Sequence, residues 1–455
     1  MKTTIITFIL LSITIALHSC DDLVEARVPE NQLEKWTVFE NSQTAYAALS
    51  GLYADLQRNS PLAGNKIGPF LGTYTDDLVS YSQNTANATY DLYANQHIAA
   101  NTNIYTIWSS AWQQIYLANS IIEAVERSAS LENEDRDTIT GEAMFARSLL
   151  YLYLVQLYGD IPYITSTDYM VNQSATKKST TEILALIRID AEKASTLLKE
   201  EYRNTDRIYP NRKTTELILA KVAILQKRWQ DAEILLHKVI DSPLYKIESD
   251  IKKVFVKTGK HILWQVRPQK EGDPTLEAST YYFNNAAPTT YSLSNDLINQ
   301  FSSSDLRKVN WITPVIYNGT TWYRSSKYKN LLANTDEYSI VFRIEEAYLL
   351  MAEVLIYQGR MQESITFLNK TRQRAGLLGL SGNYSAVDLL HEVALEERRE
   401  FFVEQGHRFF DLKKMGLLNT LSITKPNWKA YHHLWPLPQR DLLLNQNLNP
   451  QNVGY

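Results

Sequence analysis

The sequence predicts a mostly helical fold of the all-α class, in which tetratricopeptide-like helix pairs support a loop-rich region with short β-hairpins. Apolar residues recur at spacings of three and four along most of the chain, which is typical of amphipathic helices. Two spans of 34 residues, 210–243 and 343–376, each contain two such stripes separated by a tight turn. Between these spans, residues 246–337 are rich in turns and aromatic side chains.

The first 19 residues are typical of a secretory signal peptide. Lys2 precedes an apolar run over 5–17, which is shorter than the roughly 20 residues that cross a bilayer. Cys20 follows this run and is the only cysteine in 455 residues. We therefore expect Cys20 to be acylated as the first mature residue and to begin a flexible tether over 20–34. The alternative is an ordinary signal peptide with an incidental cysteine.

The N-terminal region over 35–245 is predicted to be helical. Stripes of apolar residues appear at 42–57, 107–122, 141–158 and 180–198. Gly159 ends the third helix, and Pro162 disfavours its continuation. A stretch over 59–103, dense in Asn, Thr, Gly and Tyr, is expected to be mostly loop.

The two 34-residue spans are predicted to be helix–turn–helix pairs. The first turns near Trp229 and ends at Pro243, and the second turns at Gly359. Small alanines at the expected crossing points let the paired helices approach closely. Because the repeat is degenerate, we expect isolated pairs and no regular array.

The C-terminal region over 246–455 contains β-type sequence. Residues 262–266 are typical of a strand, and the runs 312–316 and 320–324 flank Asn318-Gly319, a turn that favours a hairpin. Pro314 restricts the first of these runs to an edge strand. We expect the two regions to form one compact fold.

Composition excludes several classes of protein. A formal charge of −4 without a basic cluster argues against nucleic-acid binding. With one cysteine the chain has no intramolecular disulfide, and no second apolar run reaches membrane-spanning length. The chain has 28 tyrosines and nine tryptophans, whose flat apolar rings and polar edges suit sugar rings.

Six segments, in order, resemble the SusD/RagB family of outer-membrane nutrient-binding lipoproteins. They are Gly141-Glu142-Ala143 to Ile161-Pro162, Thr214 to Ile240, Arg343 to Glu353, Leu368-Asn369 to Gly376-Leu377, Glu396-Glu397-Arg398-Arg399-Glu400 to Asp411-Leu412, and Trp435-Pro436-Leu437-Pro438 to Gly454-Tyr455. The resemblance implies a helical scaffold with a variable loop face on the outer surface of a Bacteroidota cell. It also implies a lipid-anchored lid on a TonB-dependent, SusC-like transporter that captures oligosaccharides or, in some branches, peptides.

Ligand contacts are expected from the loop-rich stretches that the family uses for stacking on sugars, here 73–95 and 281–328. The resemblance transfers the regions and no individual residue. Aromatic and polar side chains in these stretches supply the candidates, which are Tyr74, Asp76, Tyr81, Asn84, Tyr90, Tyr282, Trp311, Trp322 and Tyr323. For Trp311 and Trp322 the alternative is cross-strand packing within the hairpin.

The charged residues of the family segments are expected to form partly buried ion pairs that fix helix crossings. Glu400, Glu404, Arg408 and Asp411 recur at three- and four-residue spacings, and Glu404 followed by Arg408 has the favourable order for a pair on one helix. The last residues, 452–455, are expected to form a docked tail.

Catalysis is not expected. No Gly-x-Ser-x-Gly, HExxH or phosphate-binding motif is present, and Asp76-Asp77 is a pair that chance supplies among 50 acidic residues. We expect no cofactor and no metal. Three functions remain: a glycan-capturing surface lipoprotein, a peptide-capturing lid of the same architecture, or a helical-repeat scaffold that joins proteins.

Overall fold

The computed structural model describes residues 37–82 and 87–455. The predicted signal peptide, Cys20, the tether and the candidate Asn84 lie outside these residues. Within the described part of the chain, no helix is both long enough and apolar enough to cross a membrane.

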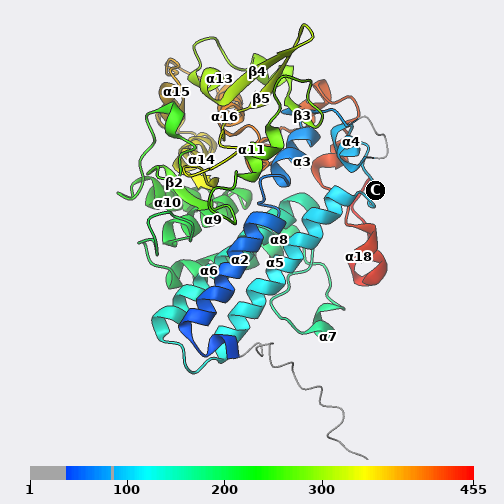
Figure 1. Cartoon of the computed structure of the whole chain (residues 1–455), viewed down its shortest axis with the longest axis vertical. Coiled ribbons are helices and arrows are strands. Elements are labelled where there is room, and N and C mark those ends of the chain that lie inside the picture. The colour runs from blue at the N-terminus through cyan, green and yellow to red at the C-terminus, as the bar shows by residue number, and fades with distance from the viewer. Residues whose placement is uncertain (1–36, 83–86) are drawn as a thin grey trace, which may run out of the picture.

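A bundle of long helices forms one end of the molecule (Figure 1). Helix α6 (Asn133–Tyr158) packs against α5 (Thr102–Arg127), α8 (Thr180–Leu197) and α2 (Ser42–Asn59). From Gly141 onward nearly every residue of α6 is buried, because neighbouring helices surround it. The predicted helices are confirmed, and Gly159 ends α6 at a φ of 73°.

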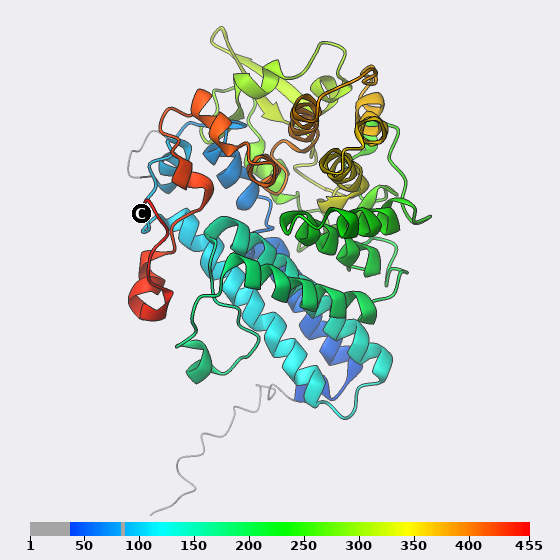
Figure 2. The same cartoon turned by 180° about the vertical axis from the view of Figure 1, so that it is seen from behind.

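Both predicted helix pairs are confirmed. The first consists of α9 (Arg212–Leu225) and α10 (Trp229–Ile240), and the second of α14 (Ile344–Tyr357) and α15 (Met361–Arg374). Their turns contain left-handed residues, Lys227 in the first and Gly359 in the second. Helix α10 packs on α14, so the two pairs stack on each other although about 100 residues separate them in the sequence. Figure 2 shows this stack from behind.

Shorter elements connect these units. The remaining helices are α3 (Ile67–Tyr74), α4 (Ala88–Tyr93), α7 (Tyr169–Asn172), α11 (Leu276–Tyr281), α12 (Asn295–Asn299), α13 (Leu306–Trp311), α16 (Ala386–Phe401), α17 (His407–Lys414) and α18 (Gln439–Leu444). The 3-10 turns are η2 (Thr37–Phe39), η3 (Ile251–Lys253), η4 (Leu418–Ile423), η5 (Ala430–His433) and η6 (Gln446–Leu448). The expectation that 59–103 is mostly loop is wrong for α3 and α4, whose buried residues pack into the fold.

The structure also contains two small sheets, of which the four-stranded one lies at the end opposite the bundle and the two-stranded one contacts α2 and α9 (Figure 1). The first has the order β1 (Leu78–Ser80), β3 (Tyr291–Leu293), β5 (Thr320–Ser325), β4 (Ile312–Tyr317), and each pair is antiparallel. The second pairs β2 (Ile262–Val266) with β6 (Ser339–Arg343). The predicted hairpin is confirmed, and Asn318 and Gly319 have the positive φ values that its two-residue turn requires.

A separate hydrophobic core lies under the four-stranded sheet. Leu78, Leu293, Ile312 and Phe402 are buried in it, and Tyr323 packs against it. One face of the sheet is therefore fixed to the fold, while side chains on the other face alternate outward.

The C-terminal residues form the predicted docked tail. The Asn452 side-chain amide donates to the carbonyl oxygens of Tyr158 at 2.8 Å and Trp435 at 2.7 Å. The Tyr455 hydroxyl donates to the carbonyl of Leu434 at 3.0 Å and lies 2.7 Å from Nε2 of His97.

Candidate functional site

Tyr74 is part of the core, and the prediction that it contacts a ligand is wrong. Its ring is fully buried among the side chains of Phe409, Trp428 and Trp435. Its hydroxyl donates to the carbonyl oxygen of His432 at 2.8 Å. The sequence around Tyr74 resembles a loop because α3 contains two glycines and a proline, yet all eight of its residues are buried.

Asp76 has a structural role, which corrects its prediction as a ligand residue. Its carboxylate accepts two hydrogen bonds from Arg408, at 2.8 and 2.9 Å, and lies 3.3 Å from Arg398. Burial raises the pKa of Asp76, but the two guanidinium groups outweigh this effect and hold it below its usual range. The adjacent Asp77 also binds Arg398, at 2.9 Å. These carboxylates anchor the start of β1 to α16 and α17.

Trp311 is also buried, with 1% of its surface exposed. It is the last residue of α13, and its indole nitrogen donates to the carbonyl of Ile251 at 3.0 Å. Phe255 and Phe402 pack against its ring. The prediction that Trp311 contacts a ligand is therefore wrong, because the residue precedes the hairpin and turns into the core.

The predicted ion pairs exist, but their partners differ. Helix α16 ends at Phe401, and left-handed residues at Gln405 and Gly406 separate it from α17, so Glu404 and Arg408 do not share a helix. Glu404 binds Arg343 at 3.1 Å, whereas Arg408 binds Asp76. The predicted pair between Glu404 and Arg408 is wrong for this reason.

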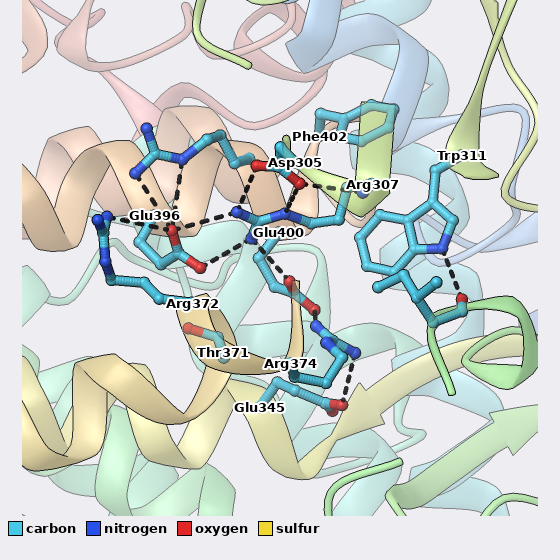
Figure 3. Close-up of polar contacts among 12 residues, drawn as sticks. Asp305, Arg307, Trp311, Glu345, Thr371, Arg372, Arg374, Glu396, Glu400 and Phe402 are labelled. Carbon is cyan, nitrogen blue, oxygen red and sulfur yellow. Dashed lines mark hydrogen bonds and ion pairs between the residues drawn. The ribbon is translucent and has the colours of Figure 1, made fainter. Parts of the chain in front are cut away.

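A buried network surrounds Glu400 (Figure 3). Arg307 lies between Asp305, Glu396 and Glu400 at distances of 2.8 to 3.0 Å, and all four side chains are fully buried. Arg343 and Arg374 also bind Glu400. Burial raises the pKa of Glu400, but these arginines hold it well below its usual range. Each charged side chain drawn has an oppositely charged partner, so the network fixes helix positions.

The outer face of the four-stranded sheet carries the remaining candidates. Leu293 of β3 stands opposite Tyr323 of β5, and both point to the core. Since side chains alternate along a strand, the flanking Trp322 and Arg324 point to the opposite face. Trp322 is partly exposed on this outer face. Tyr323 lies on the opposite face, where its ring packs against the core under the sheet.

Tyr81 extends this face from β1. Its backbone amide donates to Thr290, and its hydroxyl lies 3.0 Å from the hydroxyl of Ser292 on β3. Tyr90 and Tyr93 of α4 lie beside it, with their ring centroids 6.4 Å apart. Burial raises the pKa of Tyr93, and the hydroxyls of Tyr81 and Tyr90 add to the effect. Three half-buried tyrosines therefore gather at one corner of the sheet.

Tyr282 completes the surface from the end of α11. Its side chain is 43% exposed, and the Arg324 guanidinium lies 4.6 Å from its ring centroid. We define the aromatic face as Tyr81, Tyr90, Tyr93, Tyr282, Trp322 and Arg324. Sequence reasoning missed Arg324, although its position two residues after Trp322 on a strand could have revealed it.

The aromatic face suits a neutral ring compound with hydroxyl groups. Its members are rings with polar edges and one guanidinium. Strand β3 separates the strands that carry Tyr81 and Trp322, and the register also places these two residues four positions apart along β3, at the levels of Thr290 and Ser294. In residues 37–82 and 87–455, no group of three or more His, Cys, Asp or Glu side chains could hold a metal ion. The face can bind and orient a molecule by stacking and hydrogen bonding.

Comparisons with known proteins agree with this fold. A family model described as SusD-like, "starch-binding associating with outer membrane", matches residues 28–224. SusD-like protein P2 of Formosa agariphila is 25% identical over the full length of both chains. The crystal structure of a SusD superfamily protein from Bacteroides vulgatus is 19% identical, covers 92% of this chain and 100% of its own, and has a TM-score of 0.79.

A further solved structure is surface glycan-binding protein A from Bacteroides thetaiotaomicron in complex with laminarihexaose. It is 16% identical, covers 90% of this chain and 99% of its own, and has a TM-score of 0.75. The family-model match, the relatives aligned over nearly the whole chain and the shared fold together support a member of the SusD-like family.

Proposed function

We propose that this chain captures oligosaccharides on its aromatic face and passes them to a TonB-dependent, SusC-like transporter. In the proposal, a lipid on Cys20 holds the protein at the outer membrane, facing the extracellular side. The observation that carries the proposal is the aromatic face itself. Trp322 and Tyr81 are carried by a sheet whose other side is packed in the core, and Tyr90, Tyr93 and Tyr282 come from helix ends beside it, so the partly exposed rings are held ready for a ligand.

The expected affinity is modest. Each ring that stacks on a sugar contributes on the order of 1 kcal/mol beyond its buried area. A few stacks together with hydrogen bonds give dissociation constants in the micromolar to millimolar range. Weak capture is sufficient when many tethered copies raise the local concentration of glycan.

Substitution of the face tests glycan capture. Trp322→Ala combined with Tyr81→Ala removes two rings that different strands carry on the same face of the sheet. About 2 kcal/mol of lost stacking corresponds to roughly a 30-fold weaker affinity. Affinity electrophoresis in gels containing laminarin, starch or other polysaccharides first identifies a retained glycan, and calorimetry then measures the loss. Unchanged binding by the double variant would remove the aromatic face from the site.

Trp229→Ala is the matched control. Trp229 is also partly exposed, but it stacks on Tyr357 in the helix pairs, with centroids 4.3 Å apart. Its removal takes away an indole of the same size without touching the sheet, so glycan affinity should stay the same. Retention of peptides and of no glycan would instead support the peptide-capturing alternative.

Anchoring and partnership need separate tests. Cys20→Ala should release the protein from the membrane fraction, and a variant that stays in the membrane pellet would contradict lipid anchoring. Affinity purification of the wild-type chain from detergent-solubilised outer membranes should co-isolate a TonB-dependent transporter. Recovery of the chain alone would argue against the partnership.

A further inference from the structure

A groove lies away from the aromatic face, between α5, the segment that carries α7, and α18. Figures 1 and 2 show α7 and α18 beside the long helix α5, toward the end of the molecule opposite the hairpin. The groove has a volume of about 410 Å³. This is within the range of pockets that hold small ligands.

The floor of the groove is aromatic and rigid. Trp108, Trp112 and Tyr116 follow one another at four-residue intervals along α5 and all line the groove. The ring of Trp112 is held by edge contacts with Trp108 at 5.4 Å and with Tyr151 at 5.7 Å. Tyr116 is 53% exposed, so its ring is available for stacking.

The wall of the groove is fixed to α5 on one side. The side-chain amide of Asn119 donates to the carbonyl of Ile164 at 3.0 Å, and the Tyr151 hydroxyl donates to the same carbonyl at 2.8 Å. Farther along, the Thr167 backbone amide donates to Glu123 at 2.8 Å.

The same wall is fixed to the C-terminal segment on its other side. Asn445 donates to the carbonyl of Ala175 at 2.8 Å, and Asn447 donates to that of Ser174 at 3.0 Å. Lys177 donates to the carbonyl of Pro450 at 2.6 Å. Because the wall is attached at both sides, the groove is formed before any ligand arrives, which lowers the entropic cost of binding.

The polar groups of the groove are almost all neutral. Asn172, Gln173 and Asn445 lie along the lining, and Asp441 is the one carboxylate there. Burial raises the pKa of Asp441, while a hydrogen bond from the neighbouring Trp108 indole and the charge of Arg440 oppose this effect. A single half-buried carboxylate disfavours an anion and provides an acceptor for a hydroxyl group.

The rim of the groove carries two large, exposed apolar side chains. Tyr169 of α7 and Leu444 of α18 are each 74% exposed and line the groove from opposite sides. Exposed apolar side chains that surround a hollow are typical of a binding site.

We propose that this groove is a second carbohydrate site, which takes one or two neutral sugar units through stacking on Trp112 and Tyr116. The aromatic floor matches the C–H face of a sugar ring, and the amides and Asp441 match its hydroxyls. The site is separate from the aromatic face and stands whether or not that face binds glycan. A chain with two sites would retain a long polysaccharide more tightly than either site alone.

Tryptophan-specific fluorine NMR tests the proposal, because each site contains a tryptophan that reports on it. The full mature chain is labelled with 5-fluorotryptophan, and Trp112→Phe and Trp322→Phe assign the two signals. The probes are glucose, galactose, mannose, xylose, N-acetylglucosamine, maltose, cellobiose and laminaribiose, each at about 50 mM to detect low-millimolar affinity. At least one sugar should shift the Trp112 signal saturably.

Tyr116→Ala provides the second measurement. Loss of one stacking ring should weaken the sugar that shifts Trp112 by about fivefold, while the Trp322 signal keeps its position as a check of folding. A Trp112 signal that no sugar moves, or that only an apolar ring such as indole moves, would overturn the proposal. So would a shift that Tyr116→Ala leaves unchanged. If sugars shift the Trp322 signal and leave the Trp112 signal in place, this inference is overturned and the aromatic face is supported. If they shift the Trp112 signal alone, this inference is supported and glycan binding at the aromatic face is contradicted.

Discussion

Replacing Arg307 with methionine should destabilise the protein more than almost any other single change. The Arg307 guanidinium donates five hydrogen bonds, two to Asp305, two to Glu396 and one to Glu400. Methionine fills much of the same volume but leaves three fully buried carboxylates without this partner. Glu396 then relies on Arg399 at 3.1 Å, and Glu400 relies on Arg343 and Arg374.

The size of the effect follows from the cost of uncompensated buried charge. Summing five charge-assisted hydrogen bonds at about 1.5 to 3 kcal/mol each would account for about 7.5 to 15 kcal/mol, as much as the whole stability of a typical domain, so we do not treat the bonds as additive. Removal of one partner from a buried ion pair costs about 3 to 5 kcal/mol, and this range is our expectation for Arg307→Met. Arg307→Lys should fall between methionine and wild type, because an ammonium keeps the charge and loses the planar geometry.

Urea unfolding followed by tryptophan fluorescence measures the change. The midpoint should fall while the slope stays constant, since the surface exposed on unfolding is unchanged. Arg360→Met is the matched control. Arg360 makes a two-pronged contact with the carboxylate of Glu363 and a further ion pair with Glu233, but its side chain is partly exposed, so its loss should lower the midpoint far less. A free energy of unfolding for Arg307→Met within about 1 kcal/mol of the wild-type value would refute the reasoning.

Three further predictions concern the tail, the hairpin and acid. Burial, reinforced by His432, lowers the pKa of His97 to about 3. The folded protein therefore favours the neutral ring, and its stability is complete above pH 6.5. As the pH falls from 6.5 toward 3, the free energy of unfolding should decrease by up to about 1.4 kcal/mol per pH unit. Unfolding curves between pH 7 and 4 should show a steeper loss for wild type than for His97→Asn, and parallel curves would contradict the assignment. Asn452→Ala leaves two carbonyls without their donor and should cost about 1 to 3 kcal/mol by denaturant unfolding, whereas an unchanged midpoint would mean that the tail is not docked in solution. Gly319→Ala should cost about 1 kcal/mol because its φ of 75° is strained for alanine although the added methyl meets open space; a melting temperature equal to wild type would argue against this turn.

Local sequence patterns predicted the parts of the fold whose periodicity is regular. The long helices, both helix pairs, β2 and the β4–β5 hairpin follow from apolar spacing and from Asn318-Gly319. The strands β1, β3 and β6 have three to five residues, almost all buried, so they show no alternation to detect. These strands exist because distant partners supply their hydrogen bonds, and that information is not local.

The candidate site was predicted less well for the same reason. Sequence identifies Tyr74, Trp311 and Trp322 as aromatics near loops, but burial depends on which neighbours pack around each ring. The Trp311 indole donates to a buried carbonyl of η3, about 60 residues earlier in the chain, whereas Trp322 lies on the outer side of a strand and is partly exposed. Gln405 and Gly406 interrupt the helix, and Gly406 could have warned that Glu404 and Arg408 lie on different elements.

The four-stranded sheet combines β1, from the first hundred residues, with three strands from residues 291–325. Neither half of the chain contains the whole sheet, and the Arg398 bridge to Asp77 also joins the two halves. Fragments 37–245 and 246–455, produced separately, would each lack part of the aromatic face. Such fragments would form a complementation pair, in which recovered glycan binding reports that the two pieces have reassembled.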